Sequence, residues 1–200
     1  MENRTLAIDA DGALLDYNRA YAQVWEKAFG YAPKVRVPAA TNFYEHFDVP
    51  ILIVPELQHL KLFFNDDFWS RIPATPNAVE ACSALVNAGY DIVCVTALSE
   101  RFQDANVENL RLHKLPISKV YTTGGSSLVT HSSPTLETLI ALTPTAFVDD
   151  YQPYFYGVPS TMHRAFIADR DHAQPMDFAD SSHSDIGSFA KAWLQRMSAL

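Results

Sequence analysis

The chain has 200 residues, of which 48% are hydrophobic and 19% are charged, and its formal net charge at pH 7 is -8. This balance is typical of a globular domain and excludes collagen-like, coiled-coil and disordered chains. The acidic charge argues against broad binding to nucleic acid or to an anionic membrane, because both need a positive protein face.

The sequence carries no signature of export or of a membrane span. It has no run of about 18 consecutive apolar residues, and its N-terminus lacks the apolar core of a signal peptide. Cys82 and Cys94 lie in apolar helix and strand patterns, so we expect buried thiols rather than a disulfide or a zinc site. A cytoplasmic location is therefore expected.

Short apolar runs alternate with helical patterns along the chain and predict an α/β fold with a Rossmann-like parallel sheet. The expected strands are "TLAID" at 5–9, "DIVCVT" at 91–96, "KVYTT" at 119–123, "TAFVD" at 145–149 and "HRAFIAD" at 163–169. The expected helices are 76–88, 99–113, 134–142 and 185–198. The polar, turn-rich stretch at 169–185 is predicted to be a surface loop.

The first two expected strands are separated by far more chain than a simple crossover needs. This gap holds a helical pattern at 17–29 and two aromatic-rich stretches, "FYEHF" at 43–47 and "KLFFNDDFWSRI" at 61–72. We therefore interpret residues 17–72 as an inserted, mostly helical cap. Residues 1–16 and 73–200 form the expected α/β core.

The stretch "LAIDADGALLD" at 6–16 sets two acids one residue apart at the end of a strand. Side chains at i and i+2 of a strand point the same way, so Asp9 and Asp11 face one site, and Gly12 allows a sharp turn. Neighbouring carboxylates repel, which raises a pKa or recruits a cation between them. The alternative is an Asp-Gly turn without a function.

Polar residues also end two other expected strands. Thr96 closes "IVCVT" where a helix begins, so its hydroxyl and the nearby Ala97 N–H are candidate phosphate contacts, together with Gly12. Asp149 and Asp150 close "AFVDD" and offer the oxygen ligands that Mg²⁺ prefers. In parallel sheets, ligands bind at these carboxyl ends of strands.

With these segments in this order, the sequence resembles the haloacid dehalogenase (HAD) superfamily. The first family motif, an apolar strand followed by DxDG, is similar to "AIDADGALLD". The second motif, an apolar strand ending in Thr or Ser, is similar to "IVCVT", and the fourth, ending in two acids, is similar to "AFVDD". The insertion at 17–72 corresponds to the helical C1 cap of that family.

The resemblance implies a phosphatase mechanism. Asp9 would attack phosphorus and form an aspartyl-phosphate, while Asp11 would act as general acid and base. Mg²⁺ would be held by the carboxylates of Asp9 and Asp149 and the backbone carbonyl of Asp11, with Asp150 supporting the metal site. The dehalogenase branch lacks the second acid, so Asp11 favours a phosphatase.

The sequence departs from the family in its third motif, a lysine that usually precedes the fourth-motif strand. The equivalent text is "HSSPTLETL", with Ser133 before Pro134, and no lysine or arginine occurs between Lys119 and Asp149. Three interpretations remain open: His131 supplies the cation, Lys114 or Lys119 reaches the site, or catalysis is impaired.

Aromatic residues gather in the insertion and again in "DYQPYFYG" after the acidic pair. Helical spacing favours a small aromatic core in the insertion, and the alternative is a base-stacking pocket like that of the deoxyribonucleotidase branch. The second stretch either closes over the site or packs internally.

The sequence thus predicts a Mg²⁺-dependent phosphohydrolase that acts on a small phosphorylated metabolite as a monomer or homodimer. The alternatives are a HAD-fold binding protein without efficient turnover, a nucleotide 5'-phosphatase and a phosphomutase. A receiver domain is disfavoured by "DADG" and by the insertion.

Overall fold

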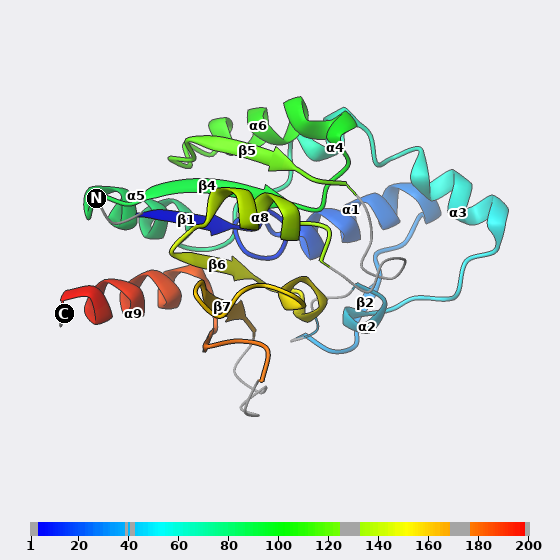
Figure 1. Cartoon of the computed structure of the whole chain (residues 1–200). Coiled ribbons are helices and arrows are strands. Elements are labelled where there is room, and N and C mark those ends of the chain that lie inside the picture. Colours follow the sequence, from blue (N-terminus) through cyan, green and yellow to red (C-terminus); the bar gives the residue numbers. More distant parts are fainter. Residues whose placement is uncertain (1–3, 39, 41–42, 125–132, 169–176, 199–200) are drawn as a thin grey trace.

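The computed structural model describes residues 4–38, 40, 43–124, 133–168 and 177–198, and these form a six-stranded sheet flanked by helices (Figure 1). The order of strands is β5-β4-β1-β6-β7-β8, and every neighbouring pair is parallel. The strands are β1 (Thr5–Ile8), β4 (Asp91–Thr96), β5 (Lys119–Thr122), β6 (Ala146–Asp149), β7 (His163–Ile167) and β8 (Ser181–His183). The predicted α/β, Rossmann-like class is confirmed.

Helices follow the strands of the core in alternation, as the sequence predicts. They are α5 (Ala78–Asn87), the short 3₁₀ segment η1 (Glu100–Phe102) continuing into α6 (Gln103–Leu112), α8 (Leu136–Leu142), a second 3₁₀ segment η2 (Gln152–Phe155) and α9 (Ile186–Ser198). Gly89 ends the turn after α5 with a φ of 88°, a left-handed conformation that glycine adopts without strain. The expected helix bounds therefore hold to within a few residues.

Alternate residues of β1 build two cores, one on each face of the sheet. Leu6 and Ile8 belong to the larger apolar cluster, which also contains buried residues of α1 (Tyr17–Phe29), α5 and α9. Ala7 belongs to a second cluster with Leu139 of α8 and Phe155 of η2. Because side chains alternate along a strand, this continuous apolar run requires helices on both sides.

Residues 17–72 contain most of the structure between β1 and β4. The described parts of this segment form α1 (Tyr17–Phe29), α2 (Phe43–His46), α3 (Val54–Lys61), α4 (Asp66–Trp69) and an antiparallel pair, β2 (Lys34–Val35) with β3 (Phe47–Asp48). Asp16 caps α1 by accepting the N–H of Arg19 at 3.0 Å. Figure 1 places α1, α2, α3 and β2 beyond the ends of the strands on the right.

One expectation for the fold is wrong. The stretch at 169–185 was predicted to be a surface loop, but Ser181–His183 form β8, which pairs with β7 through Ala165, Phe166 and Ile167. The short segment "SSH" has no apolar pattern that would predict a strand. It is a strand because its backbone pairs with β7. Residues 169–176 of the predicted loop lie outside the described residues.

Both cysteines are free and buried, as the sequence predicts. Burial raises the pKa of Cys82 to about 12, which keeps this thiol protonated and unreactive. Within the described ranges, no helix is both long and apolar enough to cross a membrane.

The docking of α9 on α5 provides a test of the core. Phe189 of α9 is fully buried, with its ring stacked on Trp193 at 5.7 Å. We expect Phe189→Ala to lower the free energy of unfolding by about 3–5 kcal/mol in denaturant titrations, because it leaves a cavity. Leu112→Ala, at a side chain that is 57% exposed, is the control and should change stability by less than about 1 kcal/mol. Equal losses in both variants would contradict this packing.

Candidate active site

The pairing of β1 with β6 brings two acids to the same edge of the sheet. Ile8 is in register with Val148, and the Asp9 N–H donates to the Val148 carbonyl at 2.9 Å. Asp9 and Asp149 are therefore neighbours at the carboxyl ends of adjacent strands. Both are buried, with exposed fractions of 3% and 0%.

The loop after β1 folds tightly on itself. The Gly12 N–H donates to the Leu15 carbonyl at 2.8 Å, and the N–H groups of Leu14 and Leu15 both donate to Ala10. Thr75 holds this loop from outside, since its hydroxyl donates to the Ala13 carbonyl at 2.8 Å. These bonds hold the backbone between Asp9 and Asp11 in one conformation.

Gly12 also makes room for an acid. Its φ is 89°, and a Cβ at this position would overlap the carboxylate of Asp150. Glycine is therefore required for both backbone conformation and space.

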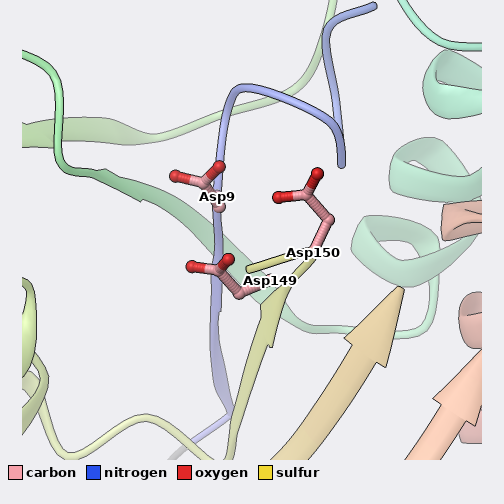
Figure 2. A group of neighbouring side chains, drawn as sticks. All are labelled: Asp9, Asp149 and Asp150. Carbon is pink, nitrogen blue, oxygen red and sulfur yellow. The ribbon is translucent and has the colours of Figure 1, made fainter. Parts of the chain in front are cut away.

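Asp9, Asp149 and Asp150 form a compact group of oxygen ligands. One carboxylate oxygen from each lies within 4.8 Å of the others, and Figure 2 shows the three side chains gathered at the ends of β1 and β6. Asp149 Oδ1 accepts the Tyr151 N–H at 2.8 Å, whereas its buried Oδ2 has no hydrogen-bond partner among the described residues. Carboxylates in this arrangement can bind a divalent metal ion.

The electrostatics of the group also favour a cation. Burial and the charges of Asp149, Asp11 and Asp150 raise the pKa of Asp9 well above its usual range. Burial and the charge of Asp150 do the same for the pKa of Asp149. Burial, followed by the charge of Asp11, raises the pKa of Asp150 to about 7. A bound cation would relieve this repulsion.

Asp9, Asp149 and Asp150 are called the three-carboxylate group below. Asp11 is the fourth acid of the site and lies outside this group. Burial raises the pKa of its carboxyl to about 7, and its buried Oδ1 has no hydrogen-bond partner among the described residues. A carboxyl group in this range exchanges protons readily near neutral pH.

Thr96 lies where the sequence analysis expects it, at the end of β4. It is 2% exposed, and its hydroxyl oxygen accepts the Leu98 N–H at 3.4 Å. Because β1 pairs with β4 through Ile8 and Cys94, Thr96 and Ala97 follow at the same edge as Asp9. The three sequence segments with predicted site residues thus meet at one edge of the sheet.

The structure also locates the candidates for a cation. Lys119 is the first residue of β5, so it lies at the amino ends of the strands, opposite the end where Asp9 lies. Its ammonium group is 4.6 Å from the Tyr121 ring centroid. Lys114 follows α6 and precedes β5, so it also lies at the amino ends of the strands. Ser133 is buried and its hydroxyl bonds to that of Thr135 at 2.7 Å. His131 lies outside the described residues.

The aromatic residues of the insertion mainly contact each other. Tyr21 stacks on Phe43 with ring centroids 4.0 Å apart, and Phe64 meets Phe68 edge-to-face at 4.8 Å. Tyr17 stacks on Trp69 at 6.0 Å. These contacts favour the interpretation as a small aromatic core.

The sequence analysis left the stretch after the acidic pair undecided, and it missed Tyr154. Burial and then the charges of Asp9 and Asp149 raise the pKa of this phenol. The one available signal was the aromatic stretch "DYQPYFYG", which does not reveal the direction of a ring.

Comparison with solved structures identifies the fold. A haloacid dehalogenase-like protein of unknown function from Agrobacterium tumefaciens is 15% identical, with a TM-score of 0.63 over 98% of this chain and 100% of that one. The L-2-haloacid dehalogenase of Xanthobacter autotrophicus with covalently bound chloropropionic acid is 13% identical, with a TM-score of 0.62 over 96% and 99%. CbbY from Rhodobacter sphaeroides in complex with phosphate is 14% identical, with a TM-score of 0.55 over 94% and 96%.

No protein-family model and no curated protein sequence matches this chain. The structural matches nevertheless extend over nearly the whole chain and agree with the motif order. The protein therefore has the haloacid dehalogenase-like fold.

Gly12→Ala tests the contact between the loop and Asp150. We expect this change to weaken Mg²⁺ binding at least about tenfold in calorimetry, because the new Cβ displaces a candidate ligand. Gly30→Ala is a matched control, since Gly30 has a φ of 79° but no atom within 4 Å of the added Cβ. Both variants should lose about 1 kcal/mol of stability from the positive φ. Equal Mg²⁺ affinity in both variants would contradict the predicted contact.

The metal-free protein should become less stable as the pH rises from about 5 to about 8. Folded Asp11 and Asp150, with pKa values of about 7, hold protons that the unfolded chain has already released, so unfolding becomes easier as pH rises. The lowered pKa values of His163 and His183 act in the opposite direction. Denaturant titrations of wild type and Asp11→Asn in a chelator isolate the acid contribution.

Wild type and Asp11→Asn carry the same histidines. The histidine contribution therefore cancels in the difference between their free energies of unfolding. Wild type should lose up to about 1.4 kcal/mol more than Asp11→Asn for each pH unit in this window. Parallel pH profiles would contradict the raised pKa of Asp11.

Proposed function

We propose that this protein is a Mg²⁺-dependent phosphoric monoester hydrolase that acts on a small phosphorylated metabolite through an aspartyl-phosphate. The observation that carries the proposal is the placement of Asp11, a further and partly buried acid with a pKa of about 7, beside the group of Asp9, Asp149 and Asp150. This combination provides a nucleophile, a proton donor and a cation site within one small volume.

Asp9 is the proposed nucleophile. One of its carboxylate oxygens attacks phosphorus, the new P–O bond forms, and the bond from phosphorus to the ester oxygen breaks. The hydrogen bond from the Asp9 N–H to Val148 and the folded loop before Leu15 hold the side chain in place. Such positioning lowers the entropic cost of the attack.

Asp11 moves the proton in both steps. Its protonated carboxyl donates to the leaving oxygen, which departs as an alcohol, and the resulting carboxylate then removes a proton from water. The water oxygen attacks the aspartyl-phosphate, the bond between phosphorus and Asp9 breaks, and inorganic phosphate is released. Asp11 is again protonated, so the cycle closes.

The residues of the three-carboxylate group fit a magnesium ion. All three offer hard oxygen ligands, and the unpartnered Oδ2 of Asp149 is available to a cation. Mg²⁺ bound there would offset the charge of Asp9 and of the phosphate, so that the two anions could meet. Asp149 and Asp150 would hold it together with Asp9.

The remaining candidate contacts surround the same edge. Thr96, the Ala97 N–H and the backbone at Gly12 are proposed to bind the phosphate oxygens. The segment 17–72 is proposed to be the cap that selects the rest of the substrate. Figure 1 is consistent with this role, since much of the segment extends past the ends of the strands.

The site favours phosphate esters over halogenated acids. A carboxylate substrate would meet four acids with raised pKa values, and proton donation by Asp11 has no use when a halide leaves. A phosphate ester uses both the cation site and the acid. This chain thus shares the fold of the solved dehalogenases, while its own acids favour a phosphate ester as the substrate.

Substitution of the two acids tests the mechanism. With p-nitrophenyl phosphate and Mg²⁺, Asp9→Asn should lower kcat at least about 10⁴-fold because the nucleophile is lost. Asp11→Asn should lower kcat about 10²–10⁴-fold, and less for p-nitrophenyl phosphate than for an alkyl phosphate, whose leaving oxygen needs the proton more. Asp91→Asn, at an exposed acid at the start of β4, is the control.

Two outcomes would overturn the proposal. Retained turnover in Asp9→Asn would exclude the aspartyl-phosphate. The second is failure of wild type to hydrolyse any member of a broad phosphate ester panel, combined with retained binding of inorganic phosphate. That result would identify a binding protein.

A further inference from the structure

A series of side-chain hydrogen bonds joins α9 to the strands β7 and β8. Nη1 of Arg196, in the last turn of α9, lies 3.0 Å from Nδ1 of His163, the first residue of β7. His163 Nε2 lies 2.8 Å from the hydroxyl oxygen of Ser181 in β8, and His183 Nε2 lies 2.8 Å from the same oxygen. We call these four residues the histidine chain.

The positions of the protons follow from the chemistry of Arg196. A guanidinium N–H can only donate, so His163 Nδ1 accepts this bond. The His163 ring is therefore neutral and carries its proton on Nε2, which donates to Ser181. The hydroxyl of Ser181 has one hydrogen to donate, and His183 Nε2 is the acceptor within reach. The histidine chain is complete only while both rings are neutral.

Aromatic residues of α9 pack against both imidazole rings. The His163 ring centroid lies 5.1 Å from that of Trp193, and the His183 ring meets Phe189 edge-to-face at 5.4 Å. Both aromatic side chains are buried. A change in the charge or orientation of either imidazole therefore acts directly on the docking of α9.

The charged and titratable groups around His163 come from all the elements packed against it. They are Arg196 from α9, Arg164 from β7, His183 from β8, and Asp180 just before β8. Arg164 donates to both carboxylate oxygens of Asp180, at 2.8 and 3.1 Å. Burial and then the charge of Arg196 lower the pKa of His163, although Asp180 acts in the opposite direction.

Protonation of His163 would break the histidine chain at its first bond. The proton goes to Nδ1, which then presents an N–H to the N–H of Arg196, and two positive charges meet across 3.0 Å. None of the ion pairs found in the described ranges includes Arg196. Because the folded chain resists this protonation, the stability that the bond contributes is present above the ordinary histidine pKa of about 6.5 and is lost as the pH falls below it.

Protonation of His183 acts in the same direction. Burial lowers the pKa of this ring as well, and the charge of Asp185 opposes the shift. A protonated ring would carry a hydrogen on Nε2, so the Ser181 hydroxyl would lose its acceptor. Both ends of the histidine chain are thus weakened by acid.

We propose that the histidine chain is a pH-sensitive latch, which holds the last turn of α9 on β7 near neutral pH and releases it in mild acid. The rest of the helix stays docked, because Ile186, Phe189 and Ala190 belong to the larger apolar cluster. This inference does not depend on the proposed phosphatase function, since His163 lies at the amino ends of the strands and the acids lie at the carboxyl ends.

Amide hydrogen exchange, followed by mass spectrometry, tests the release. After correction for the intrinsic exchange rate at each pH, protection of residues 194–198 should fall at least about tenfold between about pH 7.5 and about pH 5.5. In His163→Gln, which cannot titrate, the change over this range should be less than about threefold. The same is expected for Arg196→Met, an exposed position where the fold tolerates substitution.

His59→Gln is the matched control. His59 is an exposed histidine of α3 whose Nε2 contacts the Ala28 carbonyl at 3.2 Å, far from the histidine chain in sequence. This variant should keep the full loss of protection in acid that wild type shows.

NMR of the histidine ring nitrogens tests the order of protons directly. Near pH 7.5, His183 should carry its proton on Nδ1, because Nε2 accepts the Ser181 hydroxyl. Ser181→Ala removes that donor and should return the proton to Nε2, the form that histidine favours in water.

Three outcomes would overturn the proposal. The first is a His183 ring with its proton on Nε2 in wild type near pH 7.5. The second is wild-type protection of 194–198 that changes less than about twofold with pH. The third is a loss of protection in His163→Gln as large as that in wild type, or one spread equally over β1 and α9, which would indicate global unfolding by acid.

Discussion

Repulsion between buried and partly buried carboxylates is the constraint on which this site depends. The register of β1 against β6 sets Asp9 beside Asp149, and the residues that follow add Asp11 and Asp150. Removal of these groups from water raises their pKa values, and their mutual charge raises those of Asp9, Asp149 and Asp150 further. Such an arrangement costs stability unless protons or a cation neutralise it. A divalent ion would relieve the same repulsion, and a carboxyl group with a pKa of about 7 can donate a proton at neutral pH.

The surrounding backbone holds the acids close together although their repulsion lowers the stability of the fold. Gly12 leaves the space that the Asp150 carboxylate occupies, and the loop from Ala10 to Leu15 closes on its own carbonyl groups. On the other side, Asp149 anchors the turn that carries Tyr154. The acids are thus positioned by glycine and by backbone hydrogen bonds. A rigid site of this kind favours a ligand whose charge and geometry are complementary to it.

The strands of the core could be predicted because each is a short apolar run, and a strand buried on both faces leaves that pattern in the sequence. β8 could not, since "SSH" is polar and its order comes from backbone pairing with β7. Likewise, Asp9, Asp149 and Thr96 were predicted as site residues because each ends an apolar strand, and parallel strands end at a common edge. The close approach of Asp150 to Gly12 could not be predicted, because it depends on how two turns from different strands pack together.

The sequence by itself determined the fold class and which acids follow the apolar strands of the core. These follow from hydrophobic periodicity and from residue types at strand ends, which are local properties of the chain. Only the tertiary structure decided that Asp150 packs against Gly12, that Lys114 and Lys119 lie at the opposite ends of the strands, and that Ser181–His183 pair with β7. Those facts depend on strand order, register and turn geometry, which join residues far apart in sequence and leave no periodic signal in it.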